Sequence, residues 1–277
     1  MYRFLIGLAV LAMASTSYED SIRAWQQHRD AGLRAPDGWL TLVGLFWLKP
    51  GPNTIGSADS NDFVLPKTSP AHTGTLHLQG DKISFTDSHG AQKTLSYDDQ
   101  NPTILQAGSV SFYAIKRGNR FAVRAKDTEN PIRKNFRGMQ YFPINPALHF
   151  QAKLIPDVQK IPILNILGET DLEESPGWVE FHYQGHPYRL RPIYEDTSHG
   201  RTLYFLFKDT TNKTKTYQAG RMLNTPLAVD GVVDLDFNRA YTPPCTFTPY
   251  ATCPLPPKEN RLPIAIEAGE LRKSETD

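Results

Sequence analysis

The sequence is poor in cysteine, in excess charge of either sign and in long apolar runs. Its 2 cysteines in 277 residues are too few for a disulfide-rich scaffold or a four-thiolate zinc site. Its 30 Lys and Arg residues nearly balance 29 Asp and Glu residues, whereas a nucleic-acid-binding domain should be strongly basic. The apolar run from Phe4 to Leu11 is too short to span a bilayer core of ~30 Å as a helix, so we expect no transmembrane segment in the mature chain.

Several catalytic and cofactor motifs are also absent. The sequence contains no G-x-S-x-G, H-E-x-x-H, P-loop or G-x-G-x-x-G pattern. A serine-hydrolase elbow, a zincin and a nucleotide-binding fold therefore lose support, and we expect no cofactor. An enzyme stays open, because catalytic groups scattered along a sequence are recognised only by their geometry.

The N-terminus has the pattern of an export signal. Arg3 supplies a positive charge, an apolar core follows, and Ala12-Met13-Ala14 provides the small residues of a cleavage site. We therefore predict a signal peptide over residues 1–14, a mature chain that begins near Ser15, and a periplasmic or extracellular location. A buried first helix or strand is the alternative.

Beyond this segment, the periodicity predicts one helix followed by many short strands. The spacing of Tyr18, Ile22, Trp25 and Arg29 places them on one helical face, which we expect to pack against something larger. From Gly38 onward, short apolar runs alternate with turn residues, as in a sandwich or barrel. We predict an all-β protein with an N-terminal helical segment at 15–37, a first β domain at 38–127, and a β-sandwich or barrel-like second domain at 128–277. The expected strands of the second domain are 149–155, 161–167, 177–183, 188–194, 201–208, 215–219, 231–237 and 262–268.

Cys245 and Cys253 lie eight positions apart in the proline-rich segment PPCTFTPYATCPLPP. In an oxidising compartment we expect them to form a disulfide, and two free thiols are the alternative. The spacing excludes a catalytic C-x-x-C pair.

The segment from Asp236 to Asn260 holds the main candidates for ligand binding. Asn and Arg side chains recognise planar or anionic groups, and rigid loops are where binding groups concentrate. Alternatively, these side chains satisfy backbone groups of the loop. The candidates, with one histidine from the first domain, are Asn238, Arg239, Tyr241, Asn260 and His72. In an enzyme, His72, Asp236, Arg239 and Tyr241 would have to converge in one pocket.

Three weaker patterns have ordinary explanations beside the functional ones. Asp234, Asp236 and Asn238 have the spacing of a calcium loop, although alternation with Leu235 and Phe237 favours a polar strand face. His182 and His186 flank a turn and lack a clear third metal ligand, so we predict no metal. A cluster of eight cations has two alternative explanations: it attracts an anion, or it protects an exposed strand edge from pairing with another chain. These cations are Lys116, Arg117, Arg120, Arg124, Lys126, Arg133, Lys134 and Arg137.

Two long blocks resemble a bacterial family of unknown function. They are GWLTLVGLFWLKPGPNTIGSADSNDFVLP, from Gly38 to Pro66, and DFNRAYTPPCTFTPYATCPLPPKENRLPIAIEAGE, from Asp236 to Glu270. This resemblance implies family membership and no established activity.

The first domain also resembles forkhead-associated domains. The resemblance rests on Gly56, Asn61-Asp62-Phe63-Val64-Leu65, Ser69-Pro70-Ala71-His72 and the turn at Asp87 to Gly90. It implies a β-sandwich. Ser57 stands where those domains carry their phosphate-binding arginine, so phosphothreonine binding does not carry over.

Together these observations predict an exported protein of the cell envelope that binds a small molecule or an envelope protein. The alternative is a hydrolase-like enzyme with a scattered acid–base site around Asp236, Arg239 and Tyr241.

Overall fold

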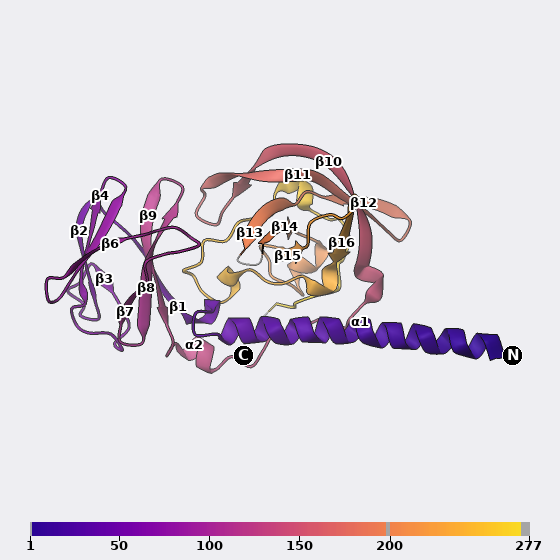
Figure 1. Ribbon diagram of the computed structural model, residues 1–277, viewed down its shortest axis with the longest axis horizontal. Helices are drawn as coiled ribbons and strands as arrows, with labels where there is room; N and C mark the ends of the chain where they lie inside the picture. Colours follow the sequence, from indigo (N-terminus) through magenta and orange to yellow (C-terminus); the bar gives the residue numbers. More distant parts are fainter. Residues whose placement is uncertain (1, 198–199, 273–277) are drawn as a thin grey trace. The chain divides into compact units, whose positions relative to one another are not determined.

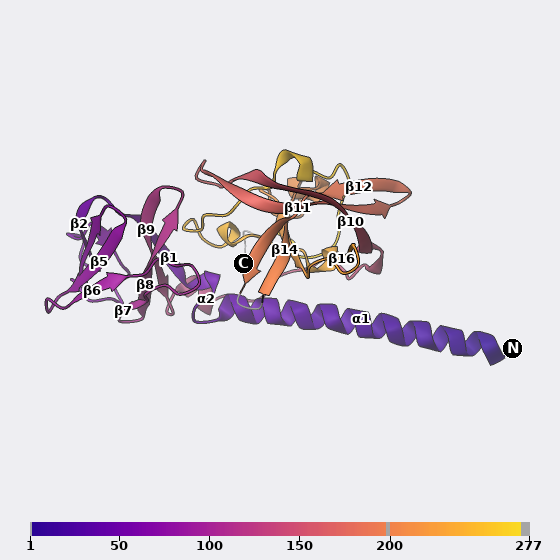
Figure 2. The ribbon, with the colours of Figure 1, turned by 45° about the horizontal axis from the view of Figure 1, so that its top comes forward.

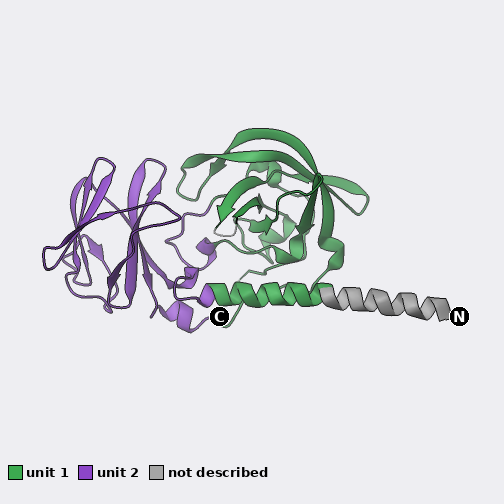
Figure 3. Ribbon diagram, viewed as in Figure 1, with its two compact units in different colours: residues 1–32, 137–243, 254–277 green, residues 33–136, 244–253 purple. Residues whose placement is uncertain are grey.

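The computed structural model describes residues 2–197 and 200–272, with side chains from residue 18 onward. The predicted signal peptide therefore lies outside the described side chains. The chain forms two compact units, which Figure 3 colours separately. The larger unit contains residues 1–32, 137–243 and 254–277, and the smaller unit contains residues 33–136 and 244–253.

These units differ from the predicted domains in the placement of the cysteine segment. Residues 244–253 belong to the smaller unit and not to the second β domain. Phe247 packs edge-on against Phe136, with ring centroids 6.4 Å apart, and the Thr248 hydroxyl donates to the Leu42 carbonyl oxygen at 3.5 Å. Contacts with residues distant in sequence therefore decide where this segment belongs.

Helix α1 (Tyr2–Arg34) carries the predicted apolar face of the N-terminal region. Ile22 is fully buried, and Trp25 packs edge-on against Tyr141 with ring centroids 6.3 Å apart. The expectation that this face packs against a larger body is confirmed within the larger unit. Among the described residues, no helix combines the length and apolar composition that a membrane crossing requires.

The larger unit contains two antiparallel sheets. The four-stranded sheet has the order β12-β11-β10-β16, and the three-stranded sheet has the order β13-β14-β15. In Figures 1 and 2, β10 and β11 arch over β13, β14 and β15. The strand bounds are β10 (His149–Leu164), β11 (Thr170–Tyr183), β12 (His186–Leu190), β13 (Ile193–Thr197), β14 (Gly200–Phe207), β15 (Arg221–Thr225) and β16 (Val232–Asp236). Short helical turns are η2 (Pro146–Leu148), η3 (Thr210–Lys213), η4 (Phe237–Arg239) and η6 (Lys258–Asn260).

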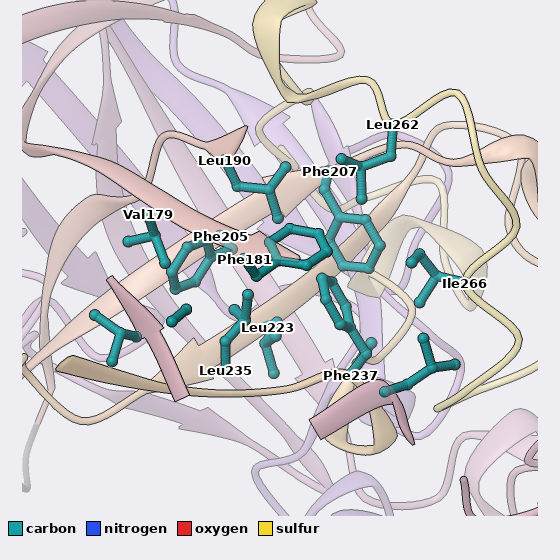
Figure 4. Packing of buried hydrophobic residues seen from close by; sticks show 14 of the residues in the cluster. Val179, Phe181, Leu190, Phe205, Phe207, Leu223, Leu235, Phe237, Leu262 and Ile266 are labelled. Atoms are coloured by element: carbon teal, nitrogen blue, oxygen red, sulfur yellow. The ribbon is translucent and has the colours of Figure 1, made fainter. Parts of the chain in front are cut away.

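The core of the larger unit lies between these sheets and is rich in phenylalanine (Figure 4). Phe237 packs against Phe181 and Phe207, with centroid separations of 5.5 and 5.3 Å. Aromatic side chains bury large apolar areas, so this cluster accounts for much of the unit's hydrophobic stabilisation.

Two of the predicted strands do not form in the larger unit. Residues 215–219 form a turn, and residues 262–268 lie outside regular strands. The second segment still buries Leu262 and Ile266. This segment makes only single backbone hydrogen bonds to the chain around β14 and η3, and one of them runs from the Thr210 N–H to the Ile264 carbonyl oxygen at 3.0 Å. A continuous series of strand hydrogen bonds does not form, because Pro263 has no N–H to donate.

The smaller unit is a two-sheet structure with one shared core. One sheet has the order β1-β9-β8-β7, and the other has the order β3-β2-β4-β5-β6. The strands are β1 (Leu42–Trp47), β2 (Gly51–Gly56), β3 (Phe63–Val64), β4 (Gly74–Gln79), β5 (Lys82–Asp87), β6 (Gln92–Leu95), β7 (Leu105–Ala107), β8 (Val110–Arg117) and β9 (Arg120–Asp127). Short helices are η1 (Trp39–Thr41), α2 (Pro131–Lys134) and η5 (Pro244–Thr246).

Gly56 allows two loops of the smaller unit to meet. A Cβ atom at this position would lie 2.3 Å from the Ala71 carbonyl oxygen, a distance that no side chain tolerates. The neighbouring Ser57 N–H donates to the Pro70 carbonyl oxygen at 2.9 Å. The segment that contains His72 therefore packs directly on the end of β2. The all-β prediction with an N-terminal helix is confirmed, and likeness to forkhead-associated domains stays a prediction.

Candidate functional site

Asp236 and Asn238 take part in a buried cluster that joins α1 to the end of β16. The Tyr18 hydroxyl donates to Asp236 Oδ1 at 2.9 Å, and Asn238 Nδ2 donates to the Tyr18 oxygen at 2.9 Å. Arg239 Nε lies 3.5 Å from Asp236 Oδ2. Burial, and then the Asp236 charge, raise the pKa of Tyr18 above its usual range. The polar groups of this cluster supply hydrogen bonds to one another, so the cluster stabilises the packing of α1 against the end of β16.

Tyr241 belongs to a different set of contacts. Its hydroxyl donates to Asn224 Oδ1 at 2.6 Å, and the Arg29 guanidinium lies 4.7 Å from the centre of its ring. The Asn224 amide in turn donates to the carboxylate of Glu195, whose pKa is raised by burial. The structure thus groups Tyr241 with Arg29 and Asn224, while Arg239 is grouped with Asp236.

Glu270 is a buried polar residue that the sequence analysis did not single out. Its side chain is fully buried and accepts hydrogen bonds from Arg29 Nε at 2.8 Å and from the Thr242 N–H at 2.7 Å. The 241 positions between Arg29 and Glu270 leave no local signal for this pair.

Asn260 satisfies buried backbone groups, as the alternative explanation for this residue predicts. Its Oδ1 accepts from the Arg191 N–H at 2.7 Å. Its Nδ2 donates to the carbonyl oxygens of Arg191 and Leu206, both at 2.9 Å. The side chain is fully buried, so these bonds join η6 to the two sheets without presenting a polar group to solvent.

The remaining candidates lie in the smaller unit. His72 is exposed. The Cys245 N–H donates to Cys253 Sγ at 3.2 Å, and Cys253 is buried. The Cys245–Cys253 disulfide stays a prediction about the protein in an oxidising compartment.

The weaker sequence patterns have structural explanations. Asp234 Oδ1 accepts from Gln151 Nε2 at 2.8 Å and lies 2.5 Å from His149 Nε2, while Asp236 binds Tyr18. His182 and His186 are exposed beside the β11–β12 turn. Among the described residues, no group of three His, Cys, Asp or Glu side chains is placed to hold a metal ion.

Most of the eight cations between positions 116 and 137 contact groups of their own unit. Arg117 lies 3.1 Å from the Asp99 carboxylate, Lys134 pairs with Glu129, and Arg120 stacks on Trp47. These contacts favour the explanation in which charges guard a strand edge. Arg124 does not fit this explanation, because its side chain is buried and does not lie at an exposed strand edge.

A cavity of about 280 Å³ lies in the larger unit where β14 meets η3 and the chain after η6. Lys208, Lys213 and Arg261 line it together with polar side chains. Within the described part of the chain, none of these three cations has an ion-pair partner. The other lining residues are Asp209, Thr210, Asn212, Gln218 and Leu262. We define these eight residues as the basic cavity.

The only acidic residue of the basic cavity is engaged elsewhere. Asp209 Oδ2 accepts from Arg221 Nη2 at 2.7 Å, and both side chains are fully buried. Asp209 Oδ1 also accepts from the Thr211 N–H at 2.8 Å and begins η3 as its cap. The three exposed or half-buried cations are therefore not neutralised locally, and the cavity has a positive potential that suits an anion.

None of the candidate residues predicted from the sequence lines the basic cavity, although Arg261 directly follows the candidate Asn260. The backbone N–H of Lys208 donates to the Asn260 carbonyl oxygen at 2.9 Å, and the N–H of Leu262 donates to the Lys208 carbonyl oxygen at 2.7 Å. These two bonds bring together cations that lie about fifty residues apart in the sequence.

Comparisons with known proteins give a family and no activity. Residues 134–271 match the model of the family described as "Protein of unknown function (DUF1684)". This match confirms a resemblance to a family of unknown function and contains the block from Asp236 to Glu270, while the block from Gly38 to Pro66 lies outside the matched residues. No curated protein matches the chain. The solution NMR structure of an uncharacterized protein from Haloarcula marismortui is 28% identical, with 52% of this chain and 80% of that chain covered and a TM-score of 0.42.

Proposed function

We propose that residues 134–271, which match the model of this family of unknown function, bind a small anionic ligand in the basic cavity. The observation that carries the proposal is the set of three cations around one cavity, none of them paired within the described chain. All eight residues of the basic cavity lie inside the matched segment. The protein is thus a binding protein, and its N-terminal pattern supports export to the cell envelope or beyond.

The size and chemistry of the basic cavity limit the ligand class. A cavity of about 280 Å³ lies just below the usual range of roughly 300–1,000 Å³ for small-molecule sites, so only a small ligand fits. Lys213, Gln218 and Arg261 are exposed, so a ligand reaches them from solvent. Arg261 can offer two parallel donors to a carboxylate or phosphate, while the lysines act as point charges. A compact carboxylate or phosphate compound fits this arrangement.

The test is isothermal titration calorimetry of the full chain with inorganic phosphate, citrate and adenosine monophosphate. We expect at least one probe to bind, and we expect Arg261→Gln and Lys213→Gln each to weaken it about tenfold, the effect of losing one charge-assisted hydrogen bond. Lys258→Gln removes an exposed cation outside the cavity and should leave the affinity unchanged. The proposal fails if no probe binds, or if Lys258→Gln weakens binding as much as Arg261→Gln does.

A further inference from the structure

The end of the β10–β11 hairpin carries an exposed apolar surface. Strands β10 and β11 run side by side as a long, curved hairpin, and the turn at its end lies between Leu164 and Thr170 (Figure 1). Large apolar side chains around this end are between 39% and 68% exposed. They are Val158, Leu164, Ile166, Leu167 and Leu172. Apolar side chains that gather on a surface in this way mark an interaction site.

The strand register places part of this surface on one face of the hairpin. Pro162 is paired with Leu172, and Leu164 lies two residues further along, on the same face as Pro162. The opposite face holds Ile161 and Ile163, which are both buried. One face of the hairpin is thus buried in the protein, while the apolar residues of the other face are in contact with solvent.

Strand β11 has an open edge beside this apolar face. Strand β12 pairs only with the stretch of β11 from Val179 to Tyr183. From Thr170 to Glu174, β11 pairs with β10 on one side, and no described strand pairs with it on the other side. The free edge of β10 is occupied near the turn, because the Leu255 N–H donates to the Leu164 carbonyl oxygen at 2.7 Å. The open edge of the hairpin is therefore the stretch Thr170–Glu174, whose backbone groups can pair with an added strand.

The open edge carries acidic side chains that have no cation beside them. Asp171 and Glu173 flank Leu172, and among the described residues neither has an ion-pair partner. Both are half-buried. Burial, and then the Asp171 charge, raise the pKa of Glu173. The edge is therefore negatively charged, and a cation beside it would relieve the repulsion between the two carboxylates.

These acids disfavour two of the surfaces that could cover the apolar face. If two copies of the chain paired antiparallel around Leu172, Asp171 of one copy would lie opposite Glu173 of the other, and like charges directly opposite in a sheet are destabilising. An anionic lipid surface would repel the same two carboxylates. A basic partner meets neither obstacle, so charge complementarity favours it.

We propose that the open edge of β11, with the apolar face beside it, binds an extended segment of another protein in which apolar and basic residues alternate. The segment adds to the sheet as a strand next to β11. Its apolar side chains cover Leu172, and its basic side chains lie beside Asp171 and Glu173, because successive residues of a strand point to opposite faces. Backbone hydrogen bonds supply affinity in this mode of binding, and the alternating side chains supply specificity. The inference is independent of the basic cavity, which none of these residues lines.

The test is fluorescence anisotropy of a labelled peptide of alternating lysine and valine, titrated with the full chain. We expect the wild type to bind it, and Leu172→Thr to bind it about tenfold more weakly, because threonine keeps the strand preference and loses apolar contact area. Val229→Thr is the matched control, since Val229 is an apolar residue of the larger unit that is 71% exposed and lies outside the hairpin. It should bind like the wild type. A peptide of alternating lysine and serine should bind more weakly than the lysine–valine peptide.

Reversing the charge of the open edge tests the electrostatic part of the inference. The double variant Asp171→Lys, Glu173→Lys should lose affinity for the lysine–valine peptide and bind a peptide of alternating glutamate and valine, which the wild type should not bind. Circular dichroism checks that the variants fold. If the double variant does not fold, Asp171→Asn decides, and it should weaken binding of the lysine–valine peptide and reduce the salt dependence of that binding.

The inference is wrong if the wild type does not bind the lysine–valine peptide, if the lysine–serine peptide binds equally well, or if Leu172→Thr binds like the wild type. Two further measurements identify other occupants of the surface. Partitioning into phosphatidylcholine vesicles that is lost in Leu172→Thr would assign the surface to a lipid membrane. Dimerisation in analytical ultracentrifugation that is lost in Leu172→Thr would assign it to a second copy of the chain. Either result would overturn the proposed partner.

Discussion

Asn260 is fully buried in the larger unit and Glu195 is half-buried there, and the two polar side chains are accommodated in different ways. Asn260 has hydrogen bonds on both ends of its amide and carries no charge. Glu195 accepts a hydrogen bond from Asn224, but burial disfavours its ionised form and raises its pKa. Asn260 therefore stabilises the fold at every pH, whereas the contribution of Glu195 depends on pH.

The substitution Glu195→Gln tests this pH dependence. The folded-state pKa of Glu195 is raised above its unfolded value, so its contribution to stability is fully present below about pH 4.3 and is lost as the pH rises through the folded pKa. Glutamine keeps an oxygen that can accept from Asn224 and cannot ionise. We expect Glu195→Gln to raise the melting temperature at neutral pH and to have little effect at pH 4, as measured by thermal unfolding of the full chain.

Glu180→Gln provides the opposite sign as a control. A hydrogen bond from Arg189 lowers the pKa of Glu180, so its contribution is present above the unfolded pKa and is lost on acidification. Glu180→Gln should therefore leave the melting temperature unchanged or lower it at neutral pH. A melting temperature that falls at neutral pH in Glu195→Gln would contradict the assignment.

At the scale of elements, α1 is attached to the larger unit through polar pairs at two levels of the helix. Tyr18 binds Asp236 at the point of α1 where the described side chains begin, and Arg29 binds Glu270 three turns later, with Ile22 and Trp25 between them. Apolar burial supplies the stabilisation, and the polar pairs select the register and rotation of the helix.

Removing Arg29 should weaken this attachment strongly. Arg29→Ala leaves the Glu270 carboxylate buried without its cation, and breaking a buried pair in this way costs about 3–5 kcal/mol. Arg29→Met combined with Glu270→Met should cost less than the sum of the single changes. The measurement is a double-mutant cycle on urea unfolding of the full chain.

Arg23→Ala is the matched control on the same helix, because Arg23 forms an exposed pair with Glu19. It should change stability by less than about 1 kcal/mol. Additive effects of the two methionine substitutions would argue against the proposed coupling of Arg29 and Glu270.

The strands were predictable wherever local periodicity and local pairing agreed. The predicted strand 201–208 matches β14 closely, and the predicted strand 177–183 is the second half of β11, which begins at Thr170. Strand β10 runs unbroken through a stretch where the sequence predicts two strands. Pro156 lies in the predicted gap between these two strands, and proline normally ends a strand. Beyond Lys153, β10 no longer pairs with β16. The edge of β10 that faced β16 therefore needs no backbone N–H donors there, and proline is tolerated.

At the scale of the whole molecule, each compact unit is assembled from separated stretches of chain. Residues 244–253 return to the smaller unit after the chain has formed most of the larger one. A boundary placed from composition cannot detect such a return, because it depends on contacts between distant residues and not on local sequence.

The proposed export of the protein makes a prediction about the intact chain. The pattern of Arg3, an apolar core and Ala12-Met13-Ala14 predicts cleavage before a mature chain that begins near Ser15. Intact-mass measurement of protein secreted by, or purified from, its own cells should give the corresponding mass. A mass that includes Met1 would refute the signal peptide.

The sequence by itself determined the N-terminal helix with one packing face, the all-β class, most strands and the resemblance to a family of unknown function. These features depend on periodicity and on contiguous motifs, which a linear chain displays directly. Only the tertiary structure decided that Asn260 serves the backbone, that Arg29 meets Glu270, and that Lys208, Lys213 and Arg261 share one cavity. Burial and charge pairing arise between residues brought together by folding, so no local pattern could reveal them.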